Sequence, residues 1–355
     1  MKIKLAILEK DSVYLNRLVA AFNVKYADAF EIYSFTEKQN AVSALDERKI
    51  DILLSSDNFD FENEAIPKRC TLAYLVDSTD IESYNEHRAI GKFQRIDLIY
   101  KQILSIYSEN AKNISLAVLG DDKTKVISFQ SVSGGCGGST MAAACAIHFA
   151  AAGKKTLYLN LEKFGVSDSF FAAEGQFDLS DIIFYLKSKK SNLALKLESC
   201  VKQDPRGVFF YSDCKVALDK MELGTDDILL LITELKLTGT YDVIVLDLDF
   251  SLAKDGMSIL NRSNAVVWVG DGSKISNLKL FRKIEMLKIM EENVEMPVYK
   301  RLSIAYNKFS NKTSEMLEGL DVRVLGGAQR FEHATTEMIL GQLAPMGMFD
   351  PLIQQ

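Results

Sequence analysis

The segment VISFQSVSGGCGGST, residues 126–140, decides how the rest of the chain is interpreted. A strand-like run, VISFQSV, gives way to a loop rich in glycine and then to Ser139 and Thr140. The following run of small residues, up to residue 153, predicts a buried helix. Glycine lets a loop wrap its N–H groups around an anion, and a helix N-terminus is electropositive. The segment therefore predicts a phosphate-binding loop, with a glycine-rich turn that binds no ligand as the alternative.

Strand-like and helix-like segments alternate on both sides of this loop. The strand-like runs are 2–8, 50–56 and 71–76 before it, and 155–161, 208–212, 241–249, 265–270 and 302–307 after it. Alternation of this kind predicts open parallel sheets covered by helices. The polar stretch 108–125 separates the two series. We therefore predict an α/β protein with one domain at 1–115 and a second at 116–355.

Length and charge exclude several classes of protein. The chain has 355 residues, enough for two domains, and a net charge of −6, which argues against a protein built around nucleic acid. Its five cysteines include no CxxC pair, so neither a zinc site nor a disulfide framework is indicated. The N-terminus resembles a strand more than a signal peptide, and no run approaches the roughly 20 apolar residues of a membrane span. These features predict a cytoplasmic protein.

A second motif indicates a metal ion beside the glycine loop. The segment YDVIVLDLD, residues 241–249, is an apolar strand that ends in carboxylates. A carboxylate at this point orients Mg²⁺ through water in many nucleotide sites, so Asp247 is the candidate. Ser139, at the start of the predicted helix, offers a hydroxyl as a direct Mg²⁺ ligand. The alternative is that the strand-end aspartates only cap a helix.

Together these segments resemble the MinD/ParA family of deviant Walker A ATPases. The family pattern K-G-G-x-G-K-[ST] corresponds to SGGCGGST at 133–140, and the resemblance extends over 120–345. It implies a P-loop NTPase sheet, ATP and Mg²⁺ as cofactors, with Ser139 and Asp247 at the metal, and a homodimer. It also implies that Glu162 positions the attacking water. The nucleotide-binding residues implied by the resemblance are Gly134, Gly135, Cys136, Gly137, Gly138, Ser139, Thr140 and Asn307.

The chain departs from the family at both lysines of that pattern. Ser133 replaces the signature lysine and Gly138 replaces the phosphate-binding lysine. A basic group that stabilises charge in phosphoryl transfer is worth roughly 10³-fold or more. We therefore predict a nucleotide-binding switch with slow or absent hydrolysis. The alternative is an active ATPase with a substitute cation, for which Lys163 is one candidate. Cys136 is interpreted as a small residue that fits the loop, with redox sensitivity as the second hypothesis.

The first 115 residues resemble a receiver (flavodoxin-like) domain, and this combination is similar to the TadZ/CpaE group of pilus localisation proteins. In a phospho-accepting receiver, an aspartate ends the third strand, where this chain has Ser56 followed by Asp57. Lys10 interrupts the acidic pair after the first strand, and Lys92 matches the late lysine. We predict a degenerate receiver used for docking. A receiver phosphorylated on Asp57, in a two-component output protein, is the alternative.

The resemblance implies an ATP-binding localisation and assembly factor for the type IVb (Tad) pilus secretion machinery. Its expected partners are a second copy of the chain and Tad components at a cell pole or membrane-associated focus. The segment APMGMFDPLIQQ, residues 344–355, contains proline and no basic residue, so we expect no direct membrane insertion. The acidic balance also argues against a DNA partition protein.

Overall fold

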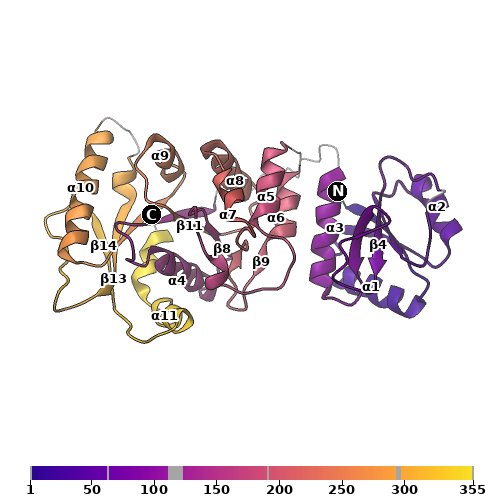
Figure 1. Ribbon diagram of the computed structural model, residues 1–355, viewed down its shortest axis with the longest axis horizontal. Coiled ribbons are helices and arrows are strands. Elements are labelled where there is room, and N and C mark those ends of the chain that lie inside the picture. Colours follow the sequence, from indigo (N-terminus) through magenta and orange to yellow (C-terminus); the bar gives the residue numbers. More distant parts are fainter. Residues whose placement is uncertain (1, 62–63, 111–122, 190–191, 293–296, 354–355) are drawn as a thin grey trace. The chain divides into compact units, whose positions relative to one another are not determined.

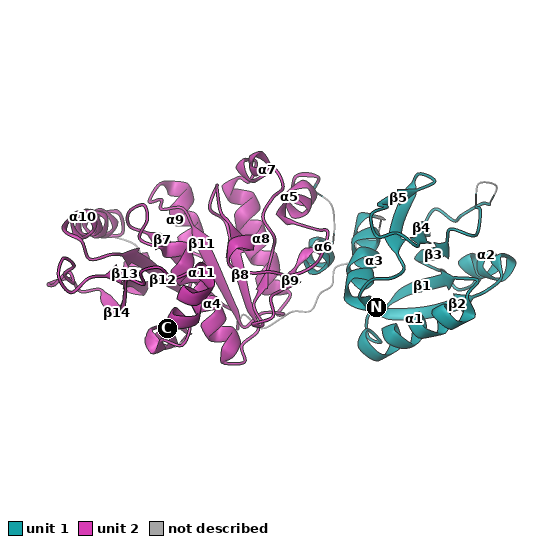
Figure 2. Cartoon of the chain, turned by 60° about the horizontal axis from the view of Figure 1, so that its bottom comes forward, with its two compact units in different colours: residues 1–115, 189–199 teal, residues 116–188, 200–355 magenta. Residues whose placement is uncertain are grey.

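The computed structural model describes residues 2–61, 64–110, 123–189, 192–292 and 297–353. The chain forms two compact units, residues 1–115 with 189–199 and residues 116–188 with 200–355 (Figure 2). Each unit contains a mainly parallel sheet with helices, which confirms the predicted α/β class. The predicted domain junction near residue 115 lies outside the described residues.

The first unit contains a six-stranded sheet in the order β2-β1-β3-β4-β6-β5, parallel except for the β5–β6 pair. Its strands are β1 (Ile3–Leu8), β2 (Phe30–Phe35), β3 (Ile52–Ser56), β4 (Thr71–Val76), β5 (Ser83–Tyr84) and β6 (His87–Gly91). Its helices are α1 (Ser12–Lys25), α2 (Lys38–Glu47), α3 (Ile96–Asn110) and, from much later in the chain, α6 (Leu193–Cys200).

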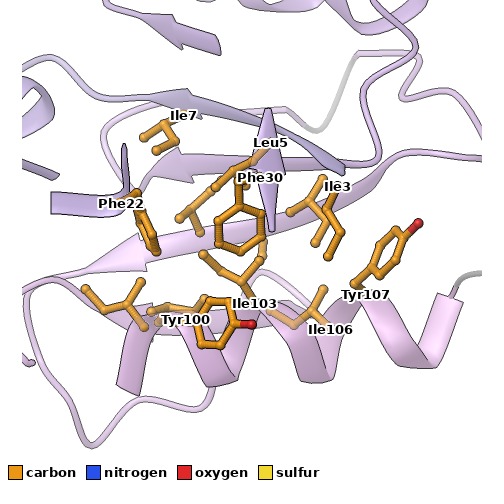
Figure 3. Packing of buried hydrophobic residues seen from close by; sticks show 14 of the residues in the cluster. Ile3, Leu5, Ile7, Phe22, Phe30, Tyr100, Ile103, Ile106 and Tyr107 are labelled. Carbon is orange, nitrogen blue, oxygen red and sulfur yellow. The ribbon is translucent and has the colours of Figure 1, made fainter. Parts of the chain in front are cut away.

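Strand β1 shows why this sheet is covered on both faces. Successive side chains of a strand point to opposite faces, so Leu5 and Ile7 lie in one apolar cluster and Ala6 and Leu8 in the other. The first cluster packs β1 against α1 and α3, with Phe22 fully buried between them (Figure 3). An apolar run without polar alternation is typical of a central parallel strand.

Helix α6 completes the first unit although about 80 residues of chain separate it from α3. The Nζ of Lys196 donates a hydrogen bond to Oγ of Ser105 at 3.0 Å, and the hydroxyl of Tyr100 donates to Oε1 of Glu198 at 3.1 Å. Leu195 packs against the cluster that contains Tyr100. Helix α6 follows β7 and β8 in the chain, but it packs in the core of the first unit.

The second unit contains an eight-stranded sheet in the order β14-β13-β12-β7-β11-β8-β10-β9, parallel except for the β9–β10 pair. Figure 1 labels β14, β13, β11, β8 and β9 of this sheet. Its strands are β7 (Lys125–Ser131), β8 (Thr156–Asn160), β9 (Lys202–Gln203), β10 (Phe209–Phe210), β11 (Val243–Leu248), β12 (Ala265–Gly270), β13 (Leu302–Phe309) and β14 (Arg323–Gln329). Its α-helices are α4 (Gly138–Ala151), α5 (Leu179–Lys187), α7 (Ala217–Met221), α8 (Thr225–Leu237), α9 (Lys254–Leu260), α10 (Lys274–Met290) and α11 (Thr336–Leu343), and its 3₁₀ helices span Ser167–Ser169, Val298–Arg301 and Gly347–Ile353.

The order of the strands brings the predicted motifs to one edge of this sheet. Strand β7 lies between β12 and β11, and β11 lies next to β8, all parallel. The carboxyl ends of β7, β8 and β11 therefore meet, which is where open α/β sheets bind their ligands. Helix α4 packs on this part of the sheet through a face of small buried residues. None of the helices described here is long and apolar enough to cross a bilayer.

Candidate functional site

The loop between β7 and α4 has a backbone that requires glycine at two positions. Gly135 and Gly137 adopt left-handed conformations, with φ of 79° and 83°. A Cβ at Gly137 would also lie 2.4 Å from Nδ2 of Asn307. A Cβ on Gly134 or Gly135, by contrast, would meet no atom within 4 Å. One side of the loop is thus closed by Asn307, and the other side has the open space that a phosphate needs.

Strand β13 holds this loop from the closed side. Buried Asn307 donates from Nδ2 to the carbonyl oxygen of Cys136 at 2.9 Å, and Lys308 donates from Nζ to the carbonyl oxygen of Gly135 at 2.7 Å. Two predicted residues, Asn307 and Cys136, therefore come together. Binding of a nucleotide by Asn307 stays a prediction, since the contact seen here is with the loop.

The side chain of Cys136 is buried beneath the loop. Its Sγ lies 3.0 Å from Oγ of Ser133 and 4.0 Å from Oγ of Ser276, and the residue has no exposed surface. Nearby, Lys283 donates from Nζ to the carbonyl oxygen of Val132 at 2.6 Å. The same ammonium lies 3.3 Å from the ring centroid of Phe250. Burial lowers the pKa of Lys283 to about 8. The burial of Cys136 supports a packing role.

Asp247 lies at the centre of a buried polar network at the ends of β8 and β11. Its Oδ2 accepts hydrogen bonds from the hydroxyl of Tyr158 at 2.7 Å and from Nδ2 of Asn160 at 3.2 Å. Burial, reinforced by the negative charge of Glu162, raises the pKa of Asp247 to about 7. A carboxyl in this state exchanges its proton close to neutral pH, so metal binding and protonation compete there.

Ser139 and Glu162 meet beside this network. Ser139, in the first turn of α4 next to Thr140, donates from Oγ to Oε2 of Glu162 at 3.0 Å. Burial raises the pKa of Glu162, and the hydrogen bond from Ser139 opposes that shift. The oxygen atoms of Ser139, Glu162 and Asp247 are the ligand type that Mg²⁺ prefers, with water and phosphate completing its shell. The described residues contain no group of three or more His, Cys, Asp or Glu arranged to hold a metal alone.

A lysine absent from every motif also points into this network. Lys220 of α7 is buried and donates from Nζ to Oδ1 of Asn160 at 3.2 Å. Lys163, the cation suggested by the sequence, instead has an exposed side chain, and its backbone N donates to Oδ2 of Asp249 at 2.9 Å. Lys220 follows Glu162 by almost 60 residues in a short helix, so no sequence spacing pointed to it.

The first unit has its own charged cluster, centred on buried Lys92. The Nζ of Lys92 lies 3.1 Å from Oε2 of Glu9, 3.3 Å from Oδ1 of Asp77, 3.8 Å from Oδ1 of Asp57 and 3.3 Å from Oγ of Ser56. Burial lowers the pKa of Lys92, but Glu9 and Asp77 raise it by more. The predicted receiver positions Ser56 and Lys92 therefore do meet, with an ammonium among the carboxylates.

Residues 1–108 match the family model described as TadZ-like, receiver domain. Among solved structures, the chain is similar to a ParA family ATPase from Chlorobium tepidum TLS, with 18% identity, a TM-score of 0.51, and coverage of 66% of this chain and 98% of that one. It is also similar to the septum site-determining protein MinD from Pyrococcus horikoshii OT3, complexed with Mg-ADP, with 16% identity, a TM-score of 0.49, and coverage of 65% and 93%.

The comparison with curated proteins gave no match. The structural similarity at 18% identity concerns the fold, and the family model concerns the receiver-like part. Each was predicted from the sequence. Residues 1–108 therefore match the TadZ-like receiver domain, and over 66% of its length the chain has a fold similar to that of a ParA family ATPase.

Proposed function

We propose that the chain is an ATP-binding localisation and assembly factor for the Tad pilus secretion machinery, acting as a dimeric scaffold with slow or absent hydrolysis. One observation carries the proposal. A TadZ-like receiver domain and a ParA-like fold share one chain, and its glycine loop has left-handed Gly135 and Gly137 but no lysine at position 133 or 138.

The residues of the second unit would bind Mg-ATP in the following way. The open glycines and the N-terminus of α4 supply N–H groups and positive potential for the phosphates. Ser139 and Asp247 hold Mg²⁺, directly and through water, once Ser139 releases Glu162. The metal ion, when bound, offsets the charge of the phosphates that the missing lysines leave uncompensated.

The same arrangement supports slow turnover. Glu162 reaches Ser139 and so lies where it can orient a water, but the loop supplies no cation for the developing charge. Loss of such a cation costs roughly 10³-fold in rate. A nucleotide that stays bound would keep the dimer in one state, as a scaffold requires.

The receiver-like unit supports docking over phosphorylation. Ser56 occupies the acceptor position at the end of β3, and Lys92 forms ion pairs with Glu9 and Asp77. A cytoplasmic protein of this kind would reach a cell pole or a membrane-associated focus through protein partners.

The test combines mass and location. Light scattering coupled to gel filtration, with and without Mg-ATP, should show a dimer in the nucleotide-bound protein. A fluorescent fusion in a cell with the Tad genes should form a focus that Asp247→Ala disperses. A protein that is monomeric with bound ATP, or spread evenly through such cells, would contradict the proposal.

Lys220 favours a second candidate, an active ATPase that cycles on and off its partners, because it places a cation beside Asn160 and Asp247. A hydrolysis assay with Glu162→Ala and Asp247→Ala as controls separates the two. Turnover within seconds that both substitutions abolish would favour the cycling enzyme over the scaffold.

A further inference from the structure

Helix α7 is oriented against its own hydrophobic pattern. Lys220 is only 7% exposed, whereas its neighbours Leu218 and Val216 are 68% and 56% exposed. Apolar burial would favour the opposite orientation, since burying an ammonium costs several kcal/mol unless opposite charges offset it. Packing therefore does not account for the inward direction of Lys220, and the charges that it faces do.

The strongest of those charges is Asp213, which lies outside the candidate site, and the others include Asp247 and Glu162 of the site. Lys220 donates to Oδ1 of Asn160, the same atom that accepts the backbone N–H of Glu162 at 3.0 Å. The amide nitrogen of Asn160 in turn donates to Asp247. Burial lowers the pKa of Lys220, and the charges of Asp213, Asp247 and Glu162 oppose that shift. One side chain, Asn160, thus separates the ammonium from the groups expected to hold Mg²⁺.

The ammonium also has hydrogen-bonding capacity to spare. A lysine has three N–H donors, and within the described part of the chain Asn160 is the one hydrogen-bond acceptor that Lys220 contacts. A buried donor without an acceptor is costly, so an anionic acceptor at this point would be bound strongly.

Two other lysines near the loop, Lys308 and Lys283, donate hydrogen bonds to backbone carbonyl oxygens of the loop segment. Lys308 and Lys283 donate to the carbonyl oxygens of Gly135 and Val132, and Lys283 also lies against the ring of Phe250. These contacts brace the loop. Of these three lysines, Lys220 is the one that faces Asn160 and, through it, Asp247.

We propose that Lys220 is the internal cation of the nucleotide site, which contacts the terminal phosphate of bound ATP and supplies part of the binding charge that the two missing loop lysines do not provide. This inference rests on the proposed function. It makes Lys220 a determinant of ATP over ADP, since ADP lacks the phosphate that the ammonium would contact.

The test is titration of the full-length, nucleotide-free protein with Mg-ATP and Mg-ADP, by calorimetry, for the wild type and four variants. Lys220→Met and Lys220→Gln remove the charge, and Lys220→Arg keeps it. Lys215→Met removes a charge from an exposed site in the same segment and serves as the control. A charge-assisted hydrogen bond predicts that both neutral variants lose about 10-fold or more in ATP affinity. Their ADP affinity should change far less, and Lys220→Arg and Lys215→Met should keep the preference for ATP.

The outcomes separate this inference from the proposed function. Suppose that the wild type binds ATP and the neutral variants lose equal affinity for ATP and ADP, or lose none. Either result would overturn the inference and leave the proposed function standing. A wild type that binds neither nucleotide would overturn both. Circular dichroism checks the fold of each variant. If either Lys220→Met or Lys220→Gln fails to fold, the other still tests the loss of charge.

Discussion

At the scale of single residues, the glycines of the loop differ in how much space surrounds them and in their backbone conformation. Gly134 and Gly137 look alike in the sequence, yet only Gly137 combines a positive φ with a close approach to Asn307. The glycine loop was predictable because its composition and position are unusual. The hydrogen bond from Asn307 to Cys136 was not, because it joins residues about 170 positions apart.

Gly137→Ala should lower the free energy of unfolding by about 1–3 kcal/mol, because its Cβ would meet Asn307 and its backbone would be strained. Gly134→Ala is the matched control and should change it by less than about 0.5 kcal/mol. Urea denaturation of the nucleotide-free proteins measures both. If both substitutions changed the unfolding free energy equally, Asn307 would not lie close to Gly137 as described.

The raised pKa of Asp247 makes stability depend on pH. The folded state holds this carboxyl proton up to a pKa of about 7, whereas the unfolded chain releases it near the ordinary aspartate pKa of 3.8. Between these values the folded state binds more protons, so this group's contribution to the unfolding free energy falls as the pH rises. Asp247→Asn removes that contribution. Relative to the wild type, the variant should therefore be more stable near pH 8 than near pH 5.

Chemical denaturation of both proteins near these two pH values, without Mg²⁺ or nucleotide, is the measurement. A difference between the variant and the wild type that is the same at both pH values would mean that Asp247 titrates as an exposed carboxyl does.

At the scale of elements, the long buried strands were predictable and the short ones were not. Strand β4 is apolar after Thr71, and β11 is apolar except for Asp247, which is the pattern of a strand covered on both faces. Strands β5 and β9 have two residues each, and β14 carries two glycines, so neither length nor pattern marks them. Helices α6 and α7 have helical composition, but their orientation depends on tertiary contacts that the sequence does not display.

The membership of α6 in the first unit has a measurable consequence. Phe22 is fully buried in the first unit, and Phe22→Ala should destabilise that unit by about 3–5 kcal/mol. Amides of α3 and α6 should then lose protection from hydrogen exchange together, while those of α4 in the second unit keep theirs. Hydrogen exchange read by mass spectrometry resolves the three helices. If the amides of α6 instead kept their protection as those of α4 do, α6 would belong to the second unit.

At the scale of the whole molecule, the chain joins a receiver-like unit with Ser56 at the end of β3 to a unit whose glycine loop has no lysine at position 133 or 138. In each unit a lysine from another element approaches the polar cluster, Lys92 in the first and Lys220 in the second. Each unit thus has a buried lysine where charged and polar side chains meet. We infer a protein whose states depend on binding more than on catalytic turnover.

The most direct test is the nucleotide content of the purified protein, followed by titration of the stripped protein with Mg-ATP. Denaturing the protein and separating the released nucleotides by ion exchange shows which one was bound. We predict intact ATP near one per chain, or saturable Mg²⁺-dependent ATP binding after stripping, with turnover of hours or longer. Absence of nucleotide together with no binding up to millimolar ATP would contradict the central claim and make the glycine loop a structural remnant.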